Sequence, residues 1–515
     1  MSTARMDPPP SDTEKDVKVP QHDSDGSSPD VEALHSEGIA PPGAIPGADN
    51  NAVSLEREKS ILRKLDKRIV PMVMWTYLMN MMDRVNIGNA RLFNMEADLG
   101  MDPNGGQFQL AVSVLFITYC LFEAPSNMII KKMKPARYLA GLTLAWGIVA
   151  TLSALVNNFA SLLACRLILG LLEAGFFPGV VLYLSMFYGR RSLALRIALF
   201  YGTAALSGAA GGLVAYGISF MNGFNGWNAW RWIILINGLP TLVTGLVIPF
   251  VLPNSPETTR FLDEGEKRDL VLIHEAQVGR AKNLTHMVKE DVWDAVRDWT
   301  TWTYCIALFP QLIMLYSFVV FLPTIINGLG TWTPAEVQAM TIPVYMFGAI
   351  VYVLCAWQSD KTQRRGYFIM GAICSAMVGY GMLYADAGAG VSYAGCFFVS
   401  VGIFLSAGIS FAWVPVNNPR YGKRAFSTGM HLTIGNSSGV AAPFLFLGND
   451  GFRTGYTISM VLLAFGLVLN IILHLHFKRQ NKERDEGKQD YLMEGKTQLE
   501  LEAMGEKNPQ FRFAI

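Results

Sequence analysis

The sequence predicts an all-α membrane protein with twelve transmembrane helices in two six-helix halves. Of its 515 residues, 51% are hydrophobic and only 16% are charged, whereas soluble domains carry about 25% charged residues. Its apolar stretches are each long enough to cross about 30 Å of hydrocarbon. A polar stretch over residues 253–300 separates the sixth from the seventh, as expected of a chain built from two repeated units.

The order of segments follows from local composition. Residues 1–54 are rich in Asp, Ser, Pro and Gly, so we expect a disordered segment there. A charged helix over residues 54–68 leads into the first half, 55–252, while the second half covers 301–477 and a charged tail covers 478–515. The predicted spans are residues 68–90, 106–128, 138–157, 160–186, 194–221, 231–252, 301–323, 335–357, 366–385, 390–414, 425–447 and 454–477.

The distribution of Lys and Arg predicts the orientation of the chain. Thirteen of them lie in the short loops after spans two, four, eight and ten, and three lie in loops on the opposite side. The larger set is Lys131, Lys132, Lys134, Arg137, Arg190, Arg191, Arg196, Lys361, Arg364, Arg365, Arg420, Lys423 and Arg424. The smaller set is Arg91, Arg231 and Arg453. Because basic loops remain in the cytoplasm, both termini are predicted to be cytoplasmic.

Several functions are not expected from this sequence. The formal net charge of +1 offers no basic surface for a nucleic acid. The sequence has no phosphate-binding loop, so ATP is not the expected energy source, and no His, Cys and Asp cluster has metal-site spacing. Residues 435–439 match the G-x-S-x-G pattern of hydrolases, but they lie inside an apolar span and not between a strand and a helix. We therefore expect no enzyme activity, cofactor or metal.

Charged residues inside the predicted spans mark a candidate site. Asp83 and Arg84 lie in span one, Arg166 and Glu173 lie in span four, and Glu123 lies near the cytoplasmic end of span two. Such side chains cost several kcal/mol in hydrocarbon unless they face a protein interior or a wet cavity. At 1.5 Å per residue, Asp83 and Arg166 both lie about 20 Å from the cytoplasmic face, and Glu173 lies about 10 Å closer to it. Spans seven to twelve carry no mid-span charge, so the ion chemistry is assigned to the first half.

The chemistry of these side chains predicts an anion site that is coupled to protons. A guanidinium keeps its proton and donates two parallel hydrogen bonds to a carboxylate, so Arg84 and Arg166 are candidate contacts of an anion. Burial away from water favours the neutral, protonated form of a carboxyl group. A buried Asp or Glu can therefore take up a proton from the acidic side and release the arginine with which it was paired. The alternative is that Arg166 and an acid form a permanent ion pair that holds spans one and four together.

Three asparagines are weaker candidates for contact with a substrate. Asn86 lies one turn from Asp83, Asn417 lies just past span ten, and Asn436 lies in span eleven. In membrane helices such amides also form hydrogen bonds between helices, and this alternative stays open for each of them.

A loop of the second half resembles a known signature. Residues 359–365, between spans eight and nine, read Ser-Asp-Lys-Thr-Gln-Arg-Arg and resemble the loop signature of the major facilitator superfamily. The resemblance implies a gating loop that contains Asp360, Lys361, Arg364 and Arg365. The corresponding loop of the first half, residues 125–137, keeps the basic residues but has Lys131 in the position of the usual acid.

Three further stretches narrow the resemblance. They are residues 83–90 (DRVNIGNA), 166–179 (RLILGLLEAGFFPG) and 194–202 (ALRIALFYG). Together they resemble the anion:cation symporter branch and, within it, the fungal allantoate permease family, which includes nicotinate, pantothenate and allantoate transporters. In that family the matching first-span arginine contacts the substrate carboxylate, and the matching acids take up protons. The resemblance gives the first role to Arg84 and the second to Asp83 and Glu173.

These observations lead to one expected function and two alternatives. We expect a monomeric, proton-coupled symporter that imports a small organic carboxylate, such as nicotinate, pantothenate or allantoate, across the plasma membrane. Its expected partners are the organic anion, protons and the lipid bilayer, with no nucleic acid. The alternatives are an exporter of a specialised metabolite and a non-transporting nutrient sensor on the same scaffold.

Overall fold

The structure is a computed structural model, and it describes eight stretches of the chain. They are residues 54–102, 105–130, 133–188, 190–279, 289–446, 452–497, 500–501 and 504–515. Within these stretches the regular structure is helical and includes no strand, which confirms the predicted all-α class. The predicted disorder of residues 1–54 concerns positions that, apart from Ser54, lie outside the described residues.

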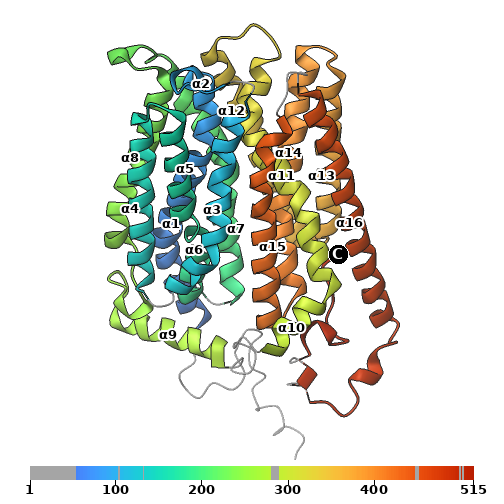
Figure 1. Ribbon diagram of the computed structural model, residues 1–515. Helices are drawn as coiled ribbons and strands as arrows, with labels where there is room; N and C mark the ends of the chain where they lie inside the picture. Colours follow the sequence, from blue (N-terminus) through green and yellow to red (C-terminus); the bar gives the residue numbers. More distant parts are fainter. Residues whose placement is uncertain are drawn as a thin grey trace, which may run out of the picture. The chain divides into compact units, whose positions relative to one another are not determined.

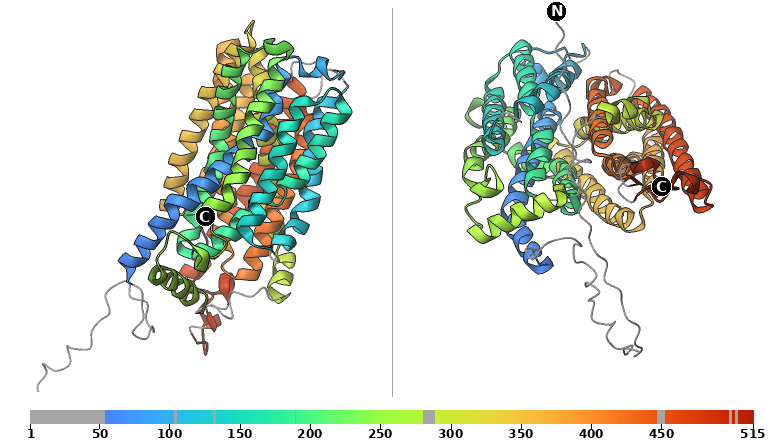
Figure 2. Two further views of the ribbon diagram at one scale, coloured as in Figure 1. Left: turned by 90° about the vertical axis from the view of Figure 1, so that its left-hand side faces the viewer. Right: turned by 90° about the horizontal axis from the view of Figure 1, so that it is seen from below.

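The helices of residues 56–515 form two groups that lie side by side, one from each half of the chain (Figures 1 and 2). The first group contains α1 (Leu55–Arg91), α3 (Gln107–Ile130), α4 (Pro135–Leu152), α5 (Phe159–Glu173), α6 (Phe176–Phe187), α7 (Arg190–Ser219) and α8 (Ala229–Val251). The second contains α11 (Trp299–Asn327), α12 (Pro334–Thr362), α13 (Arg365–Ala385), α14 (Ala389–Asn417), α15 (Tyr421–Ala441) and α16 (Arg453–Asp485).

These helices account for the twelve predicted spans. In the described part of the chain, nine segments are long and apolar enough to cross a membrane, with α5 and α6 counted together as Phe159–Phe187. The remaining spans are α1, α3 and α15. The fourth predicted span is broken between α5 and α6, directly after Glu173.

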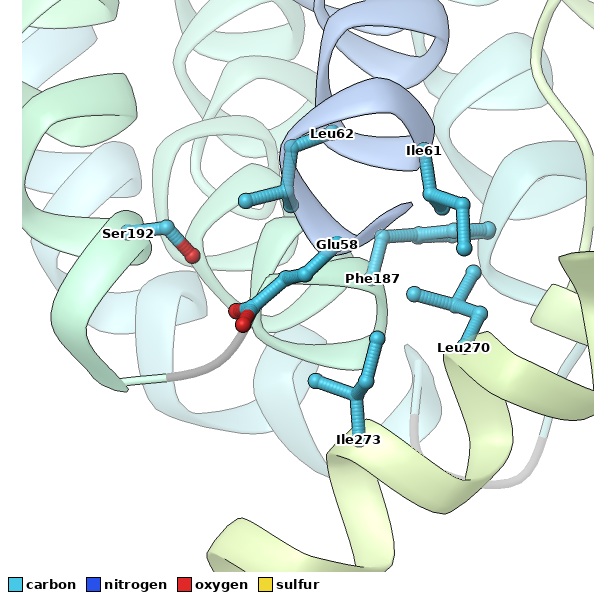
Figure 3. A pocket seen from close by; sticks show the side chains of 7 residues that line it. All are labelled: Glu58, Ile61, Leu62, Phe187, Ser192, Leu270 and Ile273. Carbon is cyan, nitrogen blue, oxygen red and sulfur yellow. The ribbon is translucent and has the colours of Figure 1, made fainter. Parts of the chain in front are cut away.

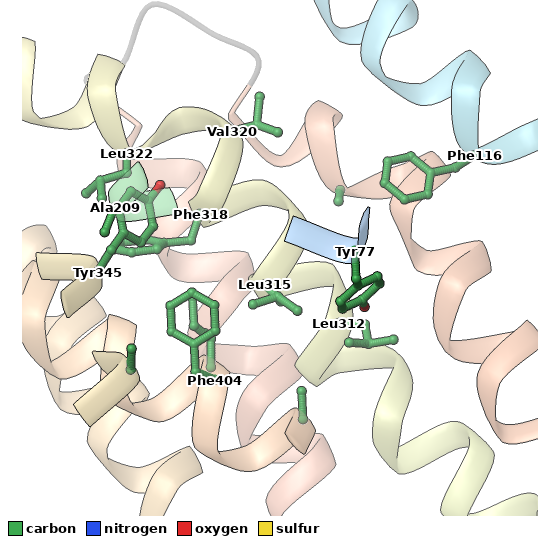
Figure 4. Packing of buried hydrophobic residues seen from close by; sticks show 14 of the residues in the cluster. Tyr77, Phe116, Ala209, Leu312, Leu315, Phe318, Val320, Leu322, Tyr345 and Phe404 are labelled. Carbon is green, nitrogen blue, oxygen red and sulfur yellow. The ribbon is translucent and has the colours of Figure 1, made fainter. Parts of the chain in front are cut away.

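Close contact between the two halves depends on glycines. A Cβ atom on Gly88 of α1 would lie 2.2 Å from the carbonyl oxygen of Val320 in α11. A Cβ atom on Gly439 of α15 would lie 2.3 Å from the ring of Phe116 in α3. Small residues allow membrane helices to approach in this way. Figure 4 shows the apolar side chains at this boundary, where Phe116 of α3 points toward the helices of the second half.

The central polar stretch, residues 253–300, contains two helices. They are α9 (Glu264–Gly279) and α10 (Lys289–Arg297), and both lie at the same end of the bundle (Figure 1). We refer to this end as the predicted cytoplasmic end. Ion pairs join α9 to the start of α1: Arg57 pairs with Asp269, and Lys64 lies 2.5 Å from Glu266.

Apolar contacts also hold α9 against the first half. Figure 3 shows a small pocket where Leu270 and Ile273 of α9 face Ile61 of α1 and Phe187 of α6. Ile61, Phe187 and Leu270 are almost fully buried. The helix therefore packs as part of the first half, because its apolar side chains lie on the face that meets α1.

The tail beyond α16 folds back onto the second half. The side chain of Asn417, at the end of α14, donates to the carbonyl oxygen of Ala514 at 3.1 Å and accepts from its N–H at 2.9 Å. Trp413 donates its indole N–H to the same carbonyl at 2.7 Å. Asn481 of α16 forms a matching pair of bonds with the backbone of Phe513, at 2.8 and 2.9 Å. The predicted charged tail is thus an ordered part of this half.

Charged groups join the tail to α10 and to the start of α15. Glu506 accepts hydrogen bonds from Arg420 at 2.7 Å and from Lys423 at 3.0 Å. Arg420 also reaches Asp294 of α10 at 2.8 Å. Burial raises the pKa of Glu506, but the hydrogen bond from Arg420 and the charge of Lys423 outweigh burial, so that its pKa lies below the ordinary value of 4.5. The carboxylate is therefore ionised at neutral pH.

Replacing Glu506 with Gln is expected to lower the free energy of unfolding by about 1–3 kcal/mol, because two largely buried cations lose a charged acceptor. In detergent the Tm would fall by about 2–5 °C. Glu486→Gln is the matched control, since Glu486 pairs with Lys488 on the exposed end of α16.

A carboxyl group whose pKa is lowered by folding contributes stability above its ordinary pKa and loses it on acidification. The Tm difference should therefore be constant near neutral pH and shrink below about pH 4.5. Equal Tm values for both variants at neutral pH would contradict this role of the tail.

Candidate functional site

The central feature of the first half is a buried ion pair between α1 and α5. Nε of Arg84 lies 2.7 Å from Oε2 of Glu173, and the two side chains are 10% and 0% exposed. The Arg84 guanidinium also lies over the ring of Tyr119 in α3, 4.6 Å from its centroid. Glu173 is the last residue of α5, and Gly175, just before α6, sits against the hydroxyl of Ser126 where a Cβ would not fit. The helix break thus places Glu173 beside Arg84.

Asp83 points away from this ion pair, toward α8. It is 8% exposed, and its Oδ2 accepts a hydrogen bond from Thr241 at 3.2 Å. Among the described residues no cation lies within ion-pair distance of it. Sequence reasoning missed Thr241 as its partner. Asn237 and Thr241 are four residues apart and share one face of α8, which was the signal that could have identified it.

Arg166 is buried without a salt bridge. It is 5% exposed, its Nε has no hydrogen-bond partner within the described part of the protein, and it belongs to none of the ion pairs found there. It interacts electrostatically with Glu173 and Asp83 but forms an ion pair with neither. The pair that joins spans one and four is therefore formed by Arg84 and Glu173, and not by Arg166 as in the alternative considered above.

A cavity of about 60 Å³ lies next to these groups, between the two halves. It has room for about four to six water molecules. Its lining includes Arg84, Arg166, Ser207, Phe116, Tyr316 and Phe404. Among the lining residues, which all lie in the described part, the two charged ones are both arginines. The cavity is thus apolar for the most part, with positive charge on its first-half side, which suits a small anion with an apolar body.

The three asparagines of the sequence analysis are placed differently. Asn436 accepts a hydrogen bond from the hydroxyl of Tyr316 at 2.7 Å and so lies directly behind the cavity wall. Asn86 is buried and faces Gly211 of α7, outside the lining. Asn417 does not line the cavity, because its amide is bonded to Tyr304 and to Ala514. In this structure Asn417 holds the tail, and its contact with a substrate stays a prediction.

The loop that resembles the gating signature connects α12 and α13. Asp360 accepts from the guanidinium of Arg365 at 2.8 Å, which joins the end of one helix to the start of the next. Lys361 lies 5.5 Å from the ring centroid of Trp357, and Arg364 is the residue before α13. In the first half the corresponding Lys131 lies outside the described residues.

Two groups of membrane helices that meet at a buried, charged cavity are the architecture of a secondary transporter. The chain matches the family model of the Major Facilitator Superfamily over residues 73–443. It therefore belongs to this superfamily and is a multi-pass membrane transporter.

Its similar proteins include fungal transporters. It is 35% identical to an uncharacterized transporter of Schizosaccharomyces pombe, over 85% of this chain and 87% of that protein. It is 33% identical to the MFS-type transporter cnsO of Penicillium expansum, over 90% and 92% of the two chains. It is 31% identical to the high-affinity nicotinic acid transporter of Saccharomyces cerevisiae, over 88% and 85%.

Solved structures with the same fold are more distant in sequence. The xylose–proton symporter XylE bound to 6-bromo-6-deoxy-D-glucose matches 81% of this chain and 95% of its own, with a TM-score of 0.63 and 14% identity. A bacterial homolog of the human lysosomal transporter Spinster matches 83% and 99%, with a TM-score of 0.62 and 14% identity. At this identity the likeness concerns the fold.

Proposed function

We propose that the protein is a proton-coupled symporter that imports a small organic carboxylate, of the nicotinate, pantothenate or allantoate kind, across the plasma membrane. Both termini are then cytoplasmic, as the basic loops predict. The observation that carries this proposal is the cavity between the halves, where Arg84 and Arg166 supply the charge and Glu173 stands directly behind Arg84.

Charge balance couples the anion to a proton. With both acids ionised, Asp83 and Glu173 balance the charges of Arg84 and Arg166. A carboxylate that enters from water adds one negative charge, and an uncompensated buried charge costs several kcal/mol. One proton taken up by Glu173 or Asp83 restores neutrality. The anion and at least one proton therefore enter the closed site together.

The ion pair determines when the second arginine becomes free. Arg166 has an unpartnered Nε and can receive the substrate carboxylate first. Arg84 is held by Glu173 until a proton neutralises that acid. Its guanidinium then turns toward the carboxylate, so that both arginines hold the anion. The neutral, occupied site lets the halves rock past each other.

Nicotinate is the first substrate to test. Support comes from the nicotinic acid transporter among the relatives and from the rings of Phe116 and Tyr316, whose centroids are 4.6 Å apart in the cavity wall. A flat aromatic acid can lie against such rings.

Uptake by yeast cells that lack their own permeases tests this function. Labelled nicotinate, pantothenate and allantoate would be offered at about pH 5 and about pH 7, with and without a protonophore. We expect one of them to accumulate at the lower pH and to lose this accumulation with the protonophore. No uptake of any of them, with the protein verified at the cell surface, would refute import and favour the exporter or the sensor.

A further inference from the structure

Glu123 of α3 is a buried acid that the mechanism above does not use. It is 7% exposed, and no ion pair in the described part of the chain contains it. It lies seven residues before Ile130, the end of α3, so about 10 Å above the predicted cytoplasmic end. A carboxyl group buried at this depth is costly, and such groups in membrane spans usually mark functional sites.

The position of Glu123 is at the seam between the two halves. Along this seam α3 packs against α15 through three contacts in succession. Ser113 donates to the carbonyl of Val440 at 2.7 Å, then Phe116 meets Gly439, and finally Thr433 donates to Oε2 of Glu123 at 3.5 Å. The last contact is the weakest and the closest to the predicted cytoplasmic end. If the halves separate at that end, this contact parts first of the three, and water then reaches the carboxyl group.

Glu123 is also linked to the central ion pair. Tyr119 lies one turn before it on α3, on the same face, and the ring of Tyr119 lies under the Arg84 guanidinium. Among the described residues, the groups that interact electrostatically with Glu123 include Arg84 of α1, Tyr119 and Cys120 of α3, and Tyr316 of α11. Arg84 is the charged one among these four, so a negative Glu123 attracts the guanidinium that Glu173 binds.

We propose that Glu123 is the group from which the co-transported proton leaves on the cytoplasmic side. This inference rests on the proposed symport. The proton that enters with the anion on Glu173 or Asp83 passes to the Glu123 carboxylate, where one O–H bond breaks and another forms. When the seam opens, Glu123 gives the proton to water and becomes negative. Its negative charge then attracts the Arg84 guanidinium and weakens the bond between this arginine and the substrate.

A purely structural role would also place an acid here, as an acceptor that fastens α3 to α15. Two substitutions separate the roles. Glu123→Gln keeps the volume and an acceptor for Thr433 but cannot release a proton. Thr433→Val keeps the volume at α15 but removes the donor. Glu123→Asp keeps a titratable group and guards against a variant that fails to fold.

The experiment compares proton-driven accumulation of labelled nicotinate with exchange of labelled for unlabelled nicotinate at equal pH, in proteoliposomes. Exchange needs no net proton release. We expect Glu123→Gln to lose accumulation by about tenfold or more while exchange stays near the wild-type rate. Glu123→Asp and Thr433→Val should retain both.

Two results would overturn the inference. One is proton-driven accumulation at the wild-type level in Glu123→Gln. The other is a loss of both accumulation and exchange in Thr433→Val as well as in Glu123→Gln, which would mean that the contact is structural. If the wild type itself shows no protonophore-sensitive uptake of any carboxylate in the panel, the proposed symport fails, and the inference fails with it.

Discussion

Arg166→Lys is expected to raise the nicotinate concentration needed for half-maximal uptake by about tenfold or more. A hydrogen bond to a charged group contributes about 1.5–3 kcal/mol, and each 1.4 kcal/mol is about tenfold in affinity. Arg166 lines the cavity and has an unpartnered Nε. Its guanidinium is therefore available for a bidentate hydrogen bond to the substrate carboxylate. Lysine retains the charge but offers a single point donor. The loss should therefore appear in the apparent affinity more than in the maximal rate.

Initial rates of uptake over a range of nicotinate concentrations measure this effect. Arg231→Lys is the matched control. Arg231 donates hydrogen bonds to Ala154 and Asn157 at the end of the first half that lies opposite the predicted cytoplasmic end, away from the cavity. We expect the control to keep the wild-type affinity. An unchanged affinity in Arg166→Lys would remove this residue from the anion site.

The sequence was sufficient for the class of fold, and two of its candidate residues, Arg84 and Arg166, line the cavity between the halves. Apolar length and the alternation of basic loops predict the spans, since both follow directly from the thickness and charge preference of a membrane. The helices α9 and α10 were not predicted, because residues 253–300 are polar and their apolar side chains form no long apolar run. The docked tail was missed because its bonds join Ala514 and Phe513 to side chains far away in the chain.

Within the site, the depth of each residue was predictable but its partner was not. Counting residues placed Glu173 about 10 Å from the level of the arginines, yet it touches Arg84 at 2.7 Å. Side chains on a helix tilt toward its N-terminus. Because α1 and α5 run in opposite directions, Arg84 and Glu173 lean toward each other and close the gap. Arg166 lies on the same helix and leans in the same direction as Glu173, hence away from that acid, and it forms no ion pair in the described part of the chain. Helix direction, and not depth alone, selects the pair.

That selection makes Glu173→Gln the most informative change of an acid. In the wild type, acidification should strengthen nicotinate binding, because protonation of Glu173 releases Arg84. In Glu173→Gln the guanidinium is free without a proton on this side chain, so nicotinate should bind more tightly than to the wild type at about pH 7, and acidification should strengthen its binding less than in the wild type. Proton-driven accumulation should be lost, since the amide cannot carry a proton. Asp83→Asn should also lose accumulation, but with the Arg84–Glu173 pair intact it should keep the pH dependence of binding.

Binding of labelled nicotinate to the purified protein at the two pH values distinguishes these outcomes. Removing one partner of a buried pair can cost about 3–5 kcal/mol of stability, so the Tm of each variant must be recorded first. Glu96→Gln is the matched control, because Glu96 pairs with Arg91 at 3.0 Å outside the cavity, and it should leave both properties unchanged. If Glu173→Gln binds nicotinate with the pH dependence of the wild type, Glu173 does not gate Arg84. In that case coupling rests on Asp83, whose bond to Thr241 leaves it without a cation to release, and proton uptake would act through the net charge of the site alone.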